Sequence, residues 1–576
     1  FRGPLRWGVR NKCLPRTDPA TNVSLGPCLK AQANRLGIPE PHSVERRFFM
    51  SQDYIPDSHN LPARQEEAGP PPSDNDDGDT TDNRQSMGDP LHSVPVSVLY
   101  GGTPSQPDTT VYVSTNEGYL HAVDASTGEE LWSFVPARLL QRLYNLYTNN
   151  VSGTRVYGLD GEITVAIENS DGQPGISGSE RVILLFGMRR GGDAVFALDV
   201  TDRSRPRLLW EIDPGTAGFE SLGQTWSKPV VTEVDVGGTD RRVALFGGGY
   251  DAGQDTRIFR EDTAGTAIYM VDLLTGDLIW SAGSGPEHDR LLTRMRYSIP
   301  SELRTFDVNG DGRADRLYFG DMGGQLWRID LFNGNGASNL GEGGVLAALG
   351  GTELGGSPPS EEIRRFYEPV DVVPVIREDK IYIALNIGSG YRAHPLDGDT
   401  LDQFFSVRDF AVFDTINTED YPAPLTVDDL ANITTIEAPI LEPDEAGWRL
   451  EMVLGQGEKI LRRSTTFANV ILFTSFTPAS IGNGCVPPGG LNRLYAVSIF
   501  DGRSQTNLDQ PGDFTPEDRT TALAQGGIAP EVQVLLPTND DGEPVDPVIL
   551  VGAELPPVSP DPQRLFKTFW LQREQP

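Results

Sequence analysis

The stretch 307–315, Asp-Val-Asn-Gly-Asp-Gly-Arg-Ala-Asp, has the residue types and spacing of a calcium-binding loop. Calcium prefers about six to eight oxygen ligands, so the loop needs oxygen-bearing side chains at alternate positions around a tight turn. Glycine at the sixth position, Gly312, permits that turn, as in an EF-hand loop. The predicted calcium ligands are the side chains of Asp307, Asn309, Asp311 and Asp315 and the main-chain carbonyl of Arg313.

The surroundings of this loop differ from those of an EF-hand. The twelfth position is Tyr318 instead of glutamate, and the flanking segments 303–306 and 316–319 have the character of strands. We therefore expect the loop to join two strands of a β-hairpin. The alternative is a turn rich in Asp, Asn and Gly that binds no metal, but the combined match of spacing and glycine favours calcium. A weaker match at 73–78 lies in the acidic segment 70–79, which we interpret as a solvated loop.

A repeated pattern of short strands surrounds the loop. Each copy contains a strand that ends in aspartate, and most copies continue into a turn and a further strand containing tryptophan. The copies lie at 119–134, 194–210, 267–280, 324–330 and 493–502. One unit of antiparallel strands cannot bury both of its faces, and stacking the units radially solves this problem. The predicted fold is all-β, a β-propeller of seven modified blades with insertions, preceded by an irregular N-terminal region.

This pattern divides the chain into two parts. Residues 1–90 are expected to form an irregular N-terminal region with an acidic linker, and residues 91–576 the propeller. Within the propeller, 137–146 is predicted to be a short helix, because its leucines lie on one side. The segment 503–546 shows no clear period, so its fold is left open. The repeated aspartate, the turn glycine and the tryptophan are interpreted as structural residues.

The composition excludes several classes of function. The net charge is −34, so the chain is repelled by nucleic acid and by anionic membrane surfaces. No apolar run approaches the length of about 18 residues that a membrane span requires. Cys13 and Cys28 are close enough in sequence to pair in an oxidising compartment, and the equal alternative is that they and Cys485 are free thiols.

Catalytic residue patterns do not stand out in the sequence. The histidines are scattered, and neither a Ser/His/Asp arrangement nor paired carboxylates can be recognised. His121 and His394 are therefore interpreted as core or loop residues rather than catalytic ones. These observations predict a protein that is not an enzyme.

The repeat and the calcium loop together resemble the C-terminal propeller domain of the PilC/PilY family of type IV pilus tip-associated proteins. The segments that resemble the family are 87–96, 115–122, 128–132, 225–229, 247–250, 388–392, 394–397 and 476–478. The resemblance implies that the calcium loop of the family corresponds to Asp307, Asn309, Asp311, the Arg313 carbonyl and Asp315.

The resemblance also implies a function and a location. Proteins of this family act at the surface of Gram-negative bacteria in pilus biogenesis, in opposing pilus retraction and in adhesion, and calcium is thought to tune these activities. The expected location is the pilus tip (fimbrium) or outer membrane, after export through the periplasm. The expected partners are minor pilins at the pilus tip and a host or surface ligand, and the expected cofactor is Ca²⁺.

Two other functions are compatible with a propeller. Asp124, Gly128 and Trp132 resemble the tryptophan-docking repeats of pyrroloquinoline-quinone dehydrogenases. Many of those enzymes use adjacent cysteines, which this chain lacks, and they hold calcium with scattered residues instead of one contiguous loop. A lectin-like binding propeller is the second alternative, and the sequence does not distinguish it from an adhesion protein.

Overall fold

The computed structural model describes residues 87–142, 155–168, 172–351, 359, 362–377, 380–479, 489–504, 515–537 and 546–558, together with the backbone of 48–51. These residues form two compact units, one ending at Ile212 and the other beginning at Asp213. Cys13, Cys28, Cys485 and the acidic segment 70–79 lie outside the described residues, as does most of the region 1–90.

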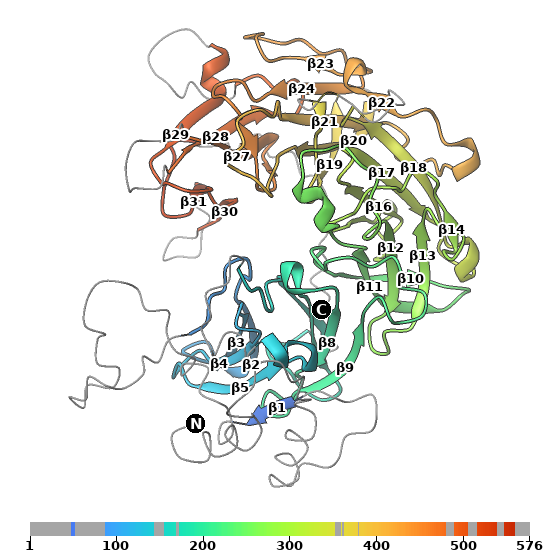
Figure 1. Cartoon of the computed structure of the whole chain (residues 1–576), viewed down its shortest axis with the longest axis vertical. Helices are drawn as coiled ribbons and strands as arrows, with labels where there is room; N and C mark the ends of the chain where they lie inside the picture. The colour runs from blue at the N-terminus through green and yellow to red at the C-terminus, as the bar shows by residue number, and fades with distance from the viewer. Residues whose placement is uncertain are drawn as a thin grey trace, which may run out of the picture. The chain divides into compact units, whose positions relative to one another are not determined.

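The first unit contains two antiparallel sheets, each a meander of four successive strands (Figure 1). One sheet consists of β2 (Val96–Thr103), β3 (Gln106–Ser114), β4 (Leu120–Asp124) and β5 (Glu130–Val135), with β1 (Phe48–Ser51) paired to β5 at its edge. The other consists of β6 (Ile163–Glu168), β7 (Arg181–Gly187), β8 (Val195–Asp199) and β9 (Arg207–Ile212).

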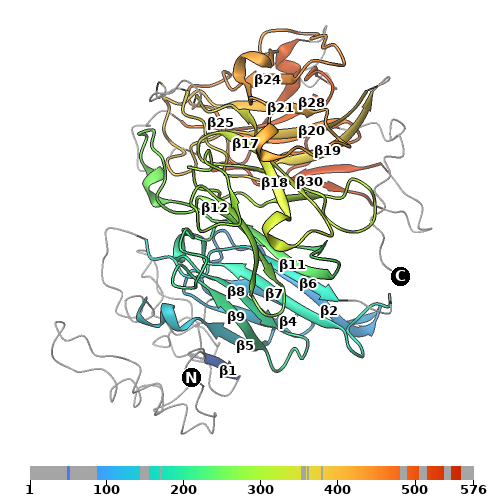
Figure 2. The ribbon, with the colours of Figure 1, turned by 90° about the vertical axis from the view of Figure 1, so that its right-hand side faces the viewer.

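The second unit contains five sheets, which follow one another in chain order from green to red in Figure 1 and, from the side, in Figure 2. The first comprises β10 (Val230–Asp235), β11 (Asp240–Gly247), β12 (Ala267–Asp272), β13 (Leu278–Gly283) and β14 (Arg290–Leu291). The second comprises β15 (Arg304–Phe306), β16 (Arg316–Gly320), β17 (Gln325–Leu331), β18 (Gly341–Ala348) and β22 (Leu425–Thr426). The third comprises β19 (Asp371–Arg377), β20 (Lys380–Gly388), β21 (Gln403–Asp409), β24 (Gly447–Glu451) and β23 (Ala431–Asn432).

The remaining two sheets lie in the C-terminal part of the second unit. One comprises β25 (Lys459–Ile460), β26 (Thr465–Phe467), β27 (Val470–Thr477), β28 (Leu491–Ser498) and β29 (Thr520–Leu523), and the other is the hairpin of β30 (Val532–Leu535) and β31 (Val548–Val551). The segment 503–546, which shows no period in sequence, therefore contributes β29 and β30. Short 3-10 turns connect the strands at Ala137–Leu139, Arg189–Gly191, Ala252–Asp255, Ala337–Asn339, Thr418–Asp420, Val427–Asp429 and Pro516–Arg519.

The predicted all-β propeller architecture agrees with these sheets, because most of them contain four neighbouring antiparallel strands. The number of seven blades stays a prediction, since the β30–β31 sheet has two strands. The predicted helix at 137–146 begins with the 3-10 turn Ala137–Leu139 and turns helical at 140–142; the rest lies outside the described residues. Within the described ranges, no helix has the length and apolar character that crossing a bilayer requires.

In two of the repeats, the aspartate that ends the strand caps the turn that follows it. Asp124 and Asp272 each accept, through Oδ1, the N–H groups of the residues two and three positions further on. Gly128 and Gly276 close the same turns by donating their N–H groups to the carbonyls of these aspartates. Both turns are thus held by local hydrogen bonds, which agrees with the structural interpretation of the repeat.

The core of the second unit lies between neighbouring sheets. One cluster of buried side chains combines Trp280 of β13 with Phe319, Trp327 and Ile329 of the next sheet. Phe319 and Trp327 stack with ring centroids 6.0 Å apart. The β15–β16 hairpin, which carries the predicted calcium loop, is therefore anchored in a packed core.

Candidate metal centre

The predicted calcium loop joins β15 to β16, as the sequence indicates. Phe306 pairs with Arg316 at the end of the hairpin, and the Asp315 N–H donates to the Phe306 carbonyl at 2.9 Å. The tip, including Asn309 and Asp311, is exposed, whereas Asp307 and Asp315 are half-buried at its base. The strands thus hold the two ends of the loop together.

Side-chain oxygens of the loop organise its backbone. Asp307 accepts the N–H groups of Gly310 and Gly312 at 2.7 and 2.8 Å. Asn309 Oδ1 and Asp311 Oδ1 each accept the N–H group two residues further on. Gly310 and Gly312 have φ angles of 79° and 90°, a left-handed conformation that glycine adopts without the steric cost of a Cβ. The alternate spacing of the ligands therefore also produces the curl of the loop.

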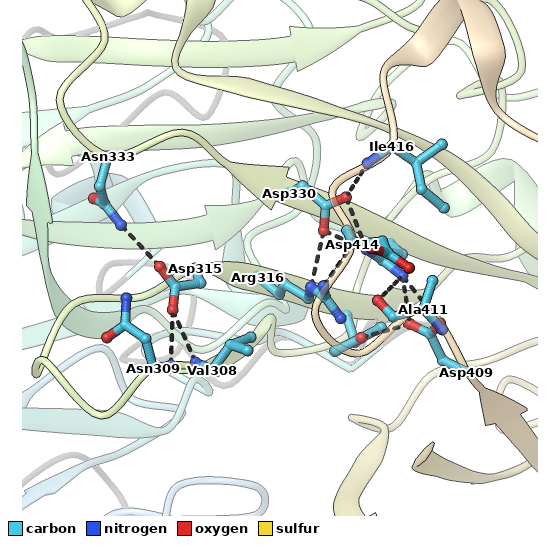
Figure 3. Close-up of polar contacts among 12 residues, drawn as sticks. Val308, Asn309, Asp315, Arg316, Asp330, Asn333, Asp409, Ala411, Asp414 and Ile416 are labelled. Carbon is cyan, nitrogen blue, oxygen red and sulfur yellow. Dashed lines mark hydrogen bonds and ion pairs between the residues drawn. The ribbon is translucent and has the colours of Figure 1, made fainter. Parts of the chain in front are cut away.

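The two half-buried carboxylates lie close to each other at the base. Asp315 Oδ2 accepts the N–H groups of Val308 and Asn309 at 2.8 and 3.4 Å, and Asn333 Nδ2 donates to Asp315 Oδ1 at 3.2 Å (Figure 3). Burial raises the pKa of Asp315, and the charge of Asp307 adds to this effect. Two carboxylates that repel each other at one point favour a cation there.

Arg313 connects the tip of the loop to the neighbouring sheet. Its Nη1 donates to Asp311 Oδ2 at 2.9 Å, while Nε and Nη2 donate to the two carboxylate oxygens of Asp240 at 2.8 and 3.1 Å. Asp240 is the first residue of β11. The Arg313 side chain therefore pairs with one of the predicted ligands, and its carbonyl is the group assigned to calcium.

Backbone and amide contacts hold the base of the loop to the same sheet. The Ala314 N–H donates to the Glu233 carbonyl of β10 at 2.9 Å. Asn333 donates to the Ala314 carbonyl as well as to Asp315, and its Oδ1 accepts the N–H of Asp235 at 2.8 Å. The loop thus lies where two neighbouring sheets of the second unit meet.

A buried ionic cluster lies beside the loop, on β16, β17 and β21 (Figure 3). Arg328 of β17 is fully buried and donates to both oxygens of Asp330 at 2.9 Å. The same guanidinium reaches both oxygens of Asp409 on β21 at 2.9 and 3.0 Å. Arg316, which follows Asp315 in the chain, pairs with Asp330 at 3.0 Å. Two arginines and two aspartates balance in charge, as burial of ions requires.

Sequence reasoning did not identify this cluster. Its signal is a pair of opposite charges, Arg328 and Asp330, within a strand whose other residues are mostly apolar, which indicates buried charges that must be paired. The partner Asp409 is 81 residues away, so only the arrangement of the sheets identifies it.

The two histidines singled out in the sequence have different environments. His121 is buried in the first unit, and its Nδ1 lies 2.5 Å from Glu130 Oε1. His394 is exposed in the second unit, and its Nε2 lies 2.8 Å from the Asp255 carbonyl. Because a carbonyl only accepts, Nε2 of His394 must carry a proton. These positions agree with a core and a loop histidine.

The residues of the loop fit a calcium ion in their chemistry. Asp307 and Asp315 offer half-buried carboxylates, Asn309 an amide oxygen and Arg313 a carbonyl, all of them hard oxygen donors. Among the described residues, however, no three His, Cys, Asp or Glu side chains are grouped so as to hold a metal ion. Asp311 pairs with the Arg313 guanidinium at 2.9 Å. The ligand set stays a prediction.

Comparison with known proteins identifies the class of this propeller. Residues 97–356 match the family profile described as the PilY1 beta-propeller domain. The type IV pilus biogenesis factor PilY1 of Pseudomonas aeruginosa is 31% identical over 257 residues, which cover 43% of this chain and 20% of that protein. A PilY1 homolog of Xylella fastidiosa is 35% identical over 219 residues, covering 38% and 16% of the two chains.

A solved structure supports the fold. The crystal structure of the Pseudomonas aeruginosa PilY1 C-terminal domain matches with a TM-score of 0.53 at 21% identity, covering 79% of this chain and 93% of that one. Residues 97–356 are thus similar in sequence to the PilY1 propeller domain of the PilC/PilY family, and the fold agrees with that similarity. The matched region spans a fifth or less of the length of these curated relatives.

Proposed function

We propose that this chain is the calcium-binding, non-enzymatic propeller of a cell-surface protein that works in type IV pilus biogenesis, in control of pilus retraction and in adhesion. The support is the similarity of residues 97–356 to the PilY1 propeller domain and of the chain to relatives that are named type IV pilus biogenesis factors. The observation that carries the calcium assignment is the loop 307–315, whose alternate oxygens cap its own turn. The partners in this proposal are minor pilins at the pilus tip and a host or surface ligand.

Calcium would be held by the side chains of Asp307, Asn309, Asp311 and Asp315 and by the Arg313 carbonyl. The ion supplies positive charge that neutralises carboxylates which otherwise repel one another. The chain's part is to bring these oxygens together through the β15–β16 hairpin and to hold the loop against the neighbouring sheet.

The position of the loop suggests how the ion acts in pilus control. The loop contacts Glu233 and Asp240 of one sheet, and Arg316, next to Asp315, enters the buried cluster that reaches Asp409 of another. Without the ion, we expect the loop to loosen while the packed strands around it stay folded. Calcium then serves as a latch between neighbouring sheets rather than as a catalytic centre.

The dehydrogenase alternative predicts a different role for the repeat. In this structure Asp124 caps its own turn, and Trp132 Nε1 donates to the Arg203 carbonyl at 2.7 Å, so both residues have structural partners. We expect the purified chain, supplied with pyrroloquinoline quinone and calcium, to reduce no artificial electron acceptor with alcohols or sugars. Clear turnover in that assay would support the enzyme.

Calcium binding itself is tested by isothermal titration of the wild type and of Asp307→Ala. We expect the variant to lose the ion, because Asp307 supplies a carboxylate at the base of the loop. The matched control is Asp428→Ala, which removes an exposed aspartate outside the loop. Equal calcium binding by wild type and Asp307→Ala would refute the assignment.

The role in the pilus is tested in the host strain with Asp315→Ala, scored for surface pili and twitching motility. We expect a folded protein that changes how pili extend or retract. If the variant is metal-free and both phenotypes match the wild type, calcium has only a structural role in this protein.

A further inference from the structure

The exposed tip of the predicted calcium loop contains the dipeptide Asn309–Gly310. In such a pair, the main-chain nitrogen of the glycine can attack the side-chain carbonyl carbon of the asparagine, because the attack closes a five-membered ring and the glycine has no Cβ to obstruct it. The ring is a succinimide, and it forms with loss of ammonia. Asn309 is therefore a candidate for chemical modification, and its surroundings determine how readily it reacts.

The nitrogen that would attack is hydrogen-bonded to a carboxylate. The Gly310 N–H donates to Asp307 Oδ1 at 2.7 Å, and the Gly312 N–H donates to the other oxygen, Oδ2, at 2.8 Å. An amide nitrogen becomes nucleophilic only as it loses its proton, so an acceptor in direct contact with that N–H has the position of a general base. The backbone of the loop thus holds Asp307 where it can promote the attack.

The carbonyl that would be attacked is hydrogen-bonded to a donor. Asn309 Oδ1 accepts the Asp311 N–H at 2.8 Å. Negative charge develops on this oxygen as a nitrogen adds to the side-chain carbon, and a donor that already points at the oxygen stabilises the charge. The side chain of Asn309 is exposed, and among the residues that the structure describes its Nδ2 has no hydrogen-bond partner. Ammonia can therefore depart into water.

Two other Asn–Gly pairs in the described part of the chain lack this arrangement. In the pair Asn333–Gly334, both ends of the asparagine amide are hydrogen-bonded, and the glycine N–H donates to the Asp235 carbonyl, which is a weaker base than a carboxylate. In the pair Asn335–Gly336, the asparagine is exposed, but within the described ranges no carboxylate accepts the glycine N–H. These pairs are internal controls, and a fourth pair, 483–484, lies outside the described residues.

We propose that Asn309 is a self-modification site, at which the loop promotes the loss of its own side-chain amide. The Gly310 nitrogen bonds to Asn309 Cγ while its proton moves to the Asp307 carboxylate. The Cγ–Nδ2 bond then breaks, and the departing nitrogen gains a proton through water, so that ammonia leaves and Asp307 returns to its carboxylate form. Water next opens the succinimide at either carbonyl. Cleavage of the new bond gives aspartate at this position, and cleavage of the original main-chain bond gives isoaspartate.

The two products change the loop in different ways. Aspartate at position 309 adds a carboxylate to those of Asp307, Asp311 and Asp315, and more ligand charge raises the calcium affinity of such loops. Isoaspartate adds a carbon atom to the main chain and moves the later ligands out of their alternate spacing. This consequence rests on the proposed calcium binding, whereas the loss of ammonia does not.

The test is incubation of the full chain, without calcium, in water enriched in heavy oxygen. Proteolysis in ordinary water and mass spectrometry then measure conversion at each Asn–Gly pair, since only conversion before proteolysis incorporates the label. We expect Asn309 to convert at least about tenfold faster than Asn335, because a positioned base typically contributes about a hundredfold or more. Unfolding the chain in urea should slow conversion of Asn309. Equal rates at the two asparagines, or faster conversion of Asn309 in the unfolded chain, would overturn the proposal.

A pair of variants isolates the carboxylate. Asp307→Asn keeps an acceptor for the Gly310 N–H but removes the base, so conversion of Asn309 should slow at least about tenfold. The matched control is Asp240→Asn, which makes the same change in charge at an exposed residue that contacts Arg313 instead of Gly310. This control should convert like the wild type. Equal conversion in wild type and Asp307→Asn would refute the role of the carboxylate, and circular dichroism checks that each variant is folded.

The consequence for calcium is measured separately with Asn309→Asp, which has the side chain of the first product. Calorimetry should give a Kd about threefold or more below that of the wild type, because the ligand charge is higher. Equal affinities would contradict the effect of the modification on calcium. A chain that binds no calcium while Asn309 still converts would refute the proposed calcium site alone, since conversion is measured without the ion.

Discussion

The Arg313 side chain is expected to compete with calcium for one of the predicted ligands. Its Nη1 lies 2.9 Å from Asp311 Oδ2, so the carboxylate must leave a cationic partner before it turns to the ion. Nε and Nη2 of the same guanidinium donate to the Asp240 carboxylate at 2.8 and 3.1 Å. Because Asp240 shares the positive charge of Arg313, it should weaken the attraction between Arg313 and Asp311. The calcium affinity should depend on both residues, in opposite directions.

We predict that Arg313→Gln binds calcium more tightly than the wild type. Glutamine retains the main-chain carbonyl that is the predicted ligand and removes the competing charge. An exposed ion pair has only a modest effect, so the gain should be about two- to fivefold in Kd. Asp240→Asn should have the opposite effect and weaken binding by a similar factor, because Arg313 loses its outward partner and turns fully to Asp311.

The measurement is calcium titration by calorimetry at low ionic strength, where exposed charges are least screened. Arg241→Gln is the matched control. Arg241 follows Asp240 on β11, but its side chain pairs with Asp272 at 3.7 Å instead of with a residue of the loop. It makes the same change in net charge and should alter the affinity less than Arg313→Gln does. If Arg313→Gln binds calcium equally or more weakly while Asp307→Ala abolishes binding, the competition argument is wrong.

Three further predictions concern pH and stability. Burial raises the pKa of Asp315, so calcium affinity should begin to fall at a higher pH than an ordinary aspartate would produce; calorimetry at a series of pH values measures this. Burial raises the pKa of Asp321 from 3.8 to about 7, so the folded state holds this proton more tightly than the unfolded state does. The contribution of Asp321 to stability should therefore fall as pH rises from about 4 to about 7, and urea unfolding of Asp321→Asn should lack this slope. Arg328→Met leaves Asp330 and Asp409 buried without their guanidinium, and urea unfolding should show a loss of about 3–5 kcal/mol; an unchanged midpoint would contradict the cluster's role.

Local patterns in the sequence determine the hairpin, the loop and the class of fold. The alternate oxygens and glycines of 307–315 act on neighbouring residues, so their hydrogen bonds can be anticipated from spacing alone. The same holds for the capped turns after Asp124 and Asp272, whose partners lie two to four residues away. Repetition of such units predicts a propeller, because each sheet must cover a face of the next.

Contacts between sheets were decided only by the tertiary structure. Arg313 and Asp240 are 73 residues apart, and Arg328 and Asp409 are 81 apart. Nothing in their local sequence identifies these partners, since pairing depends on which strands become neighbours once the sheets have packed. Packing also decides which backbone carbonyls accept hydrogen bonds from the buried Lys459 ammonium, because a carbonyl is present at every residue and has no sequence signature. The sequence by itself thus determined the oxygen donors of the loop, while the packing of the sheets determined the charged groups that surround them.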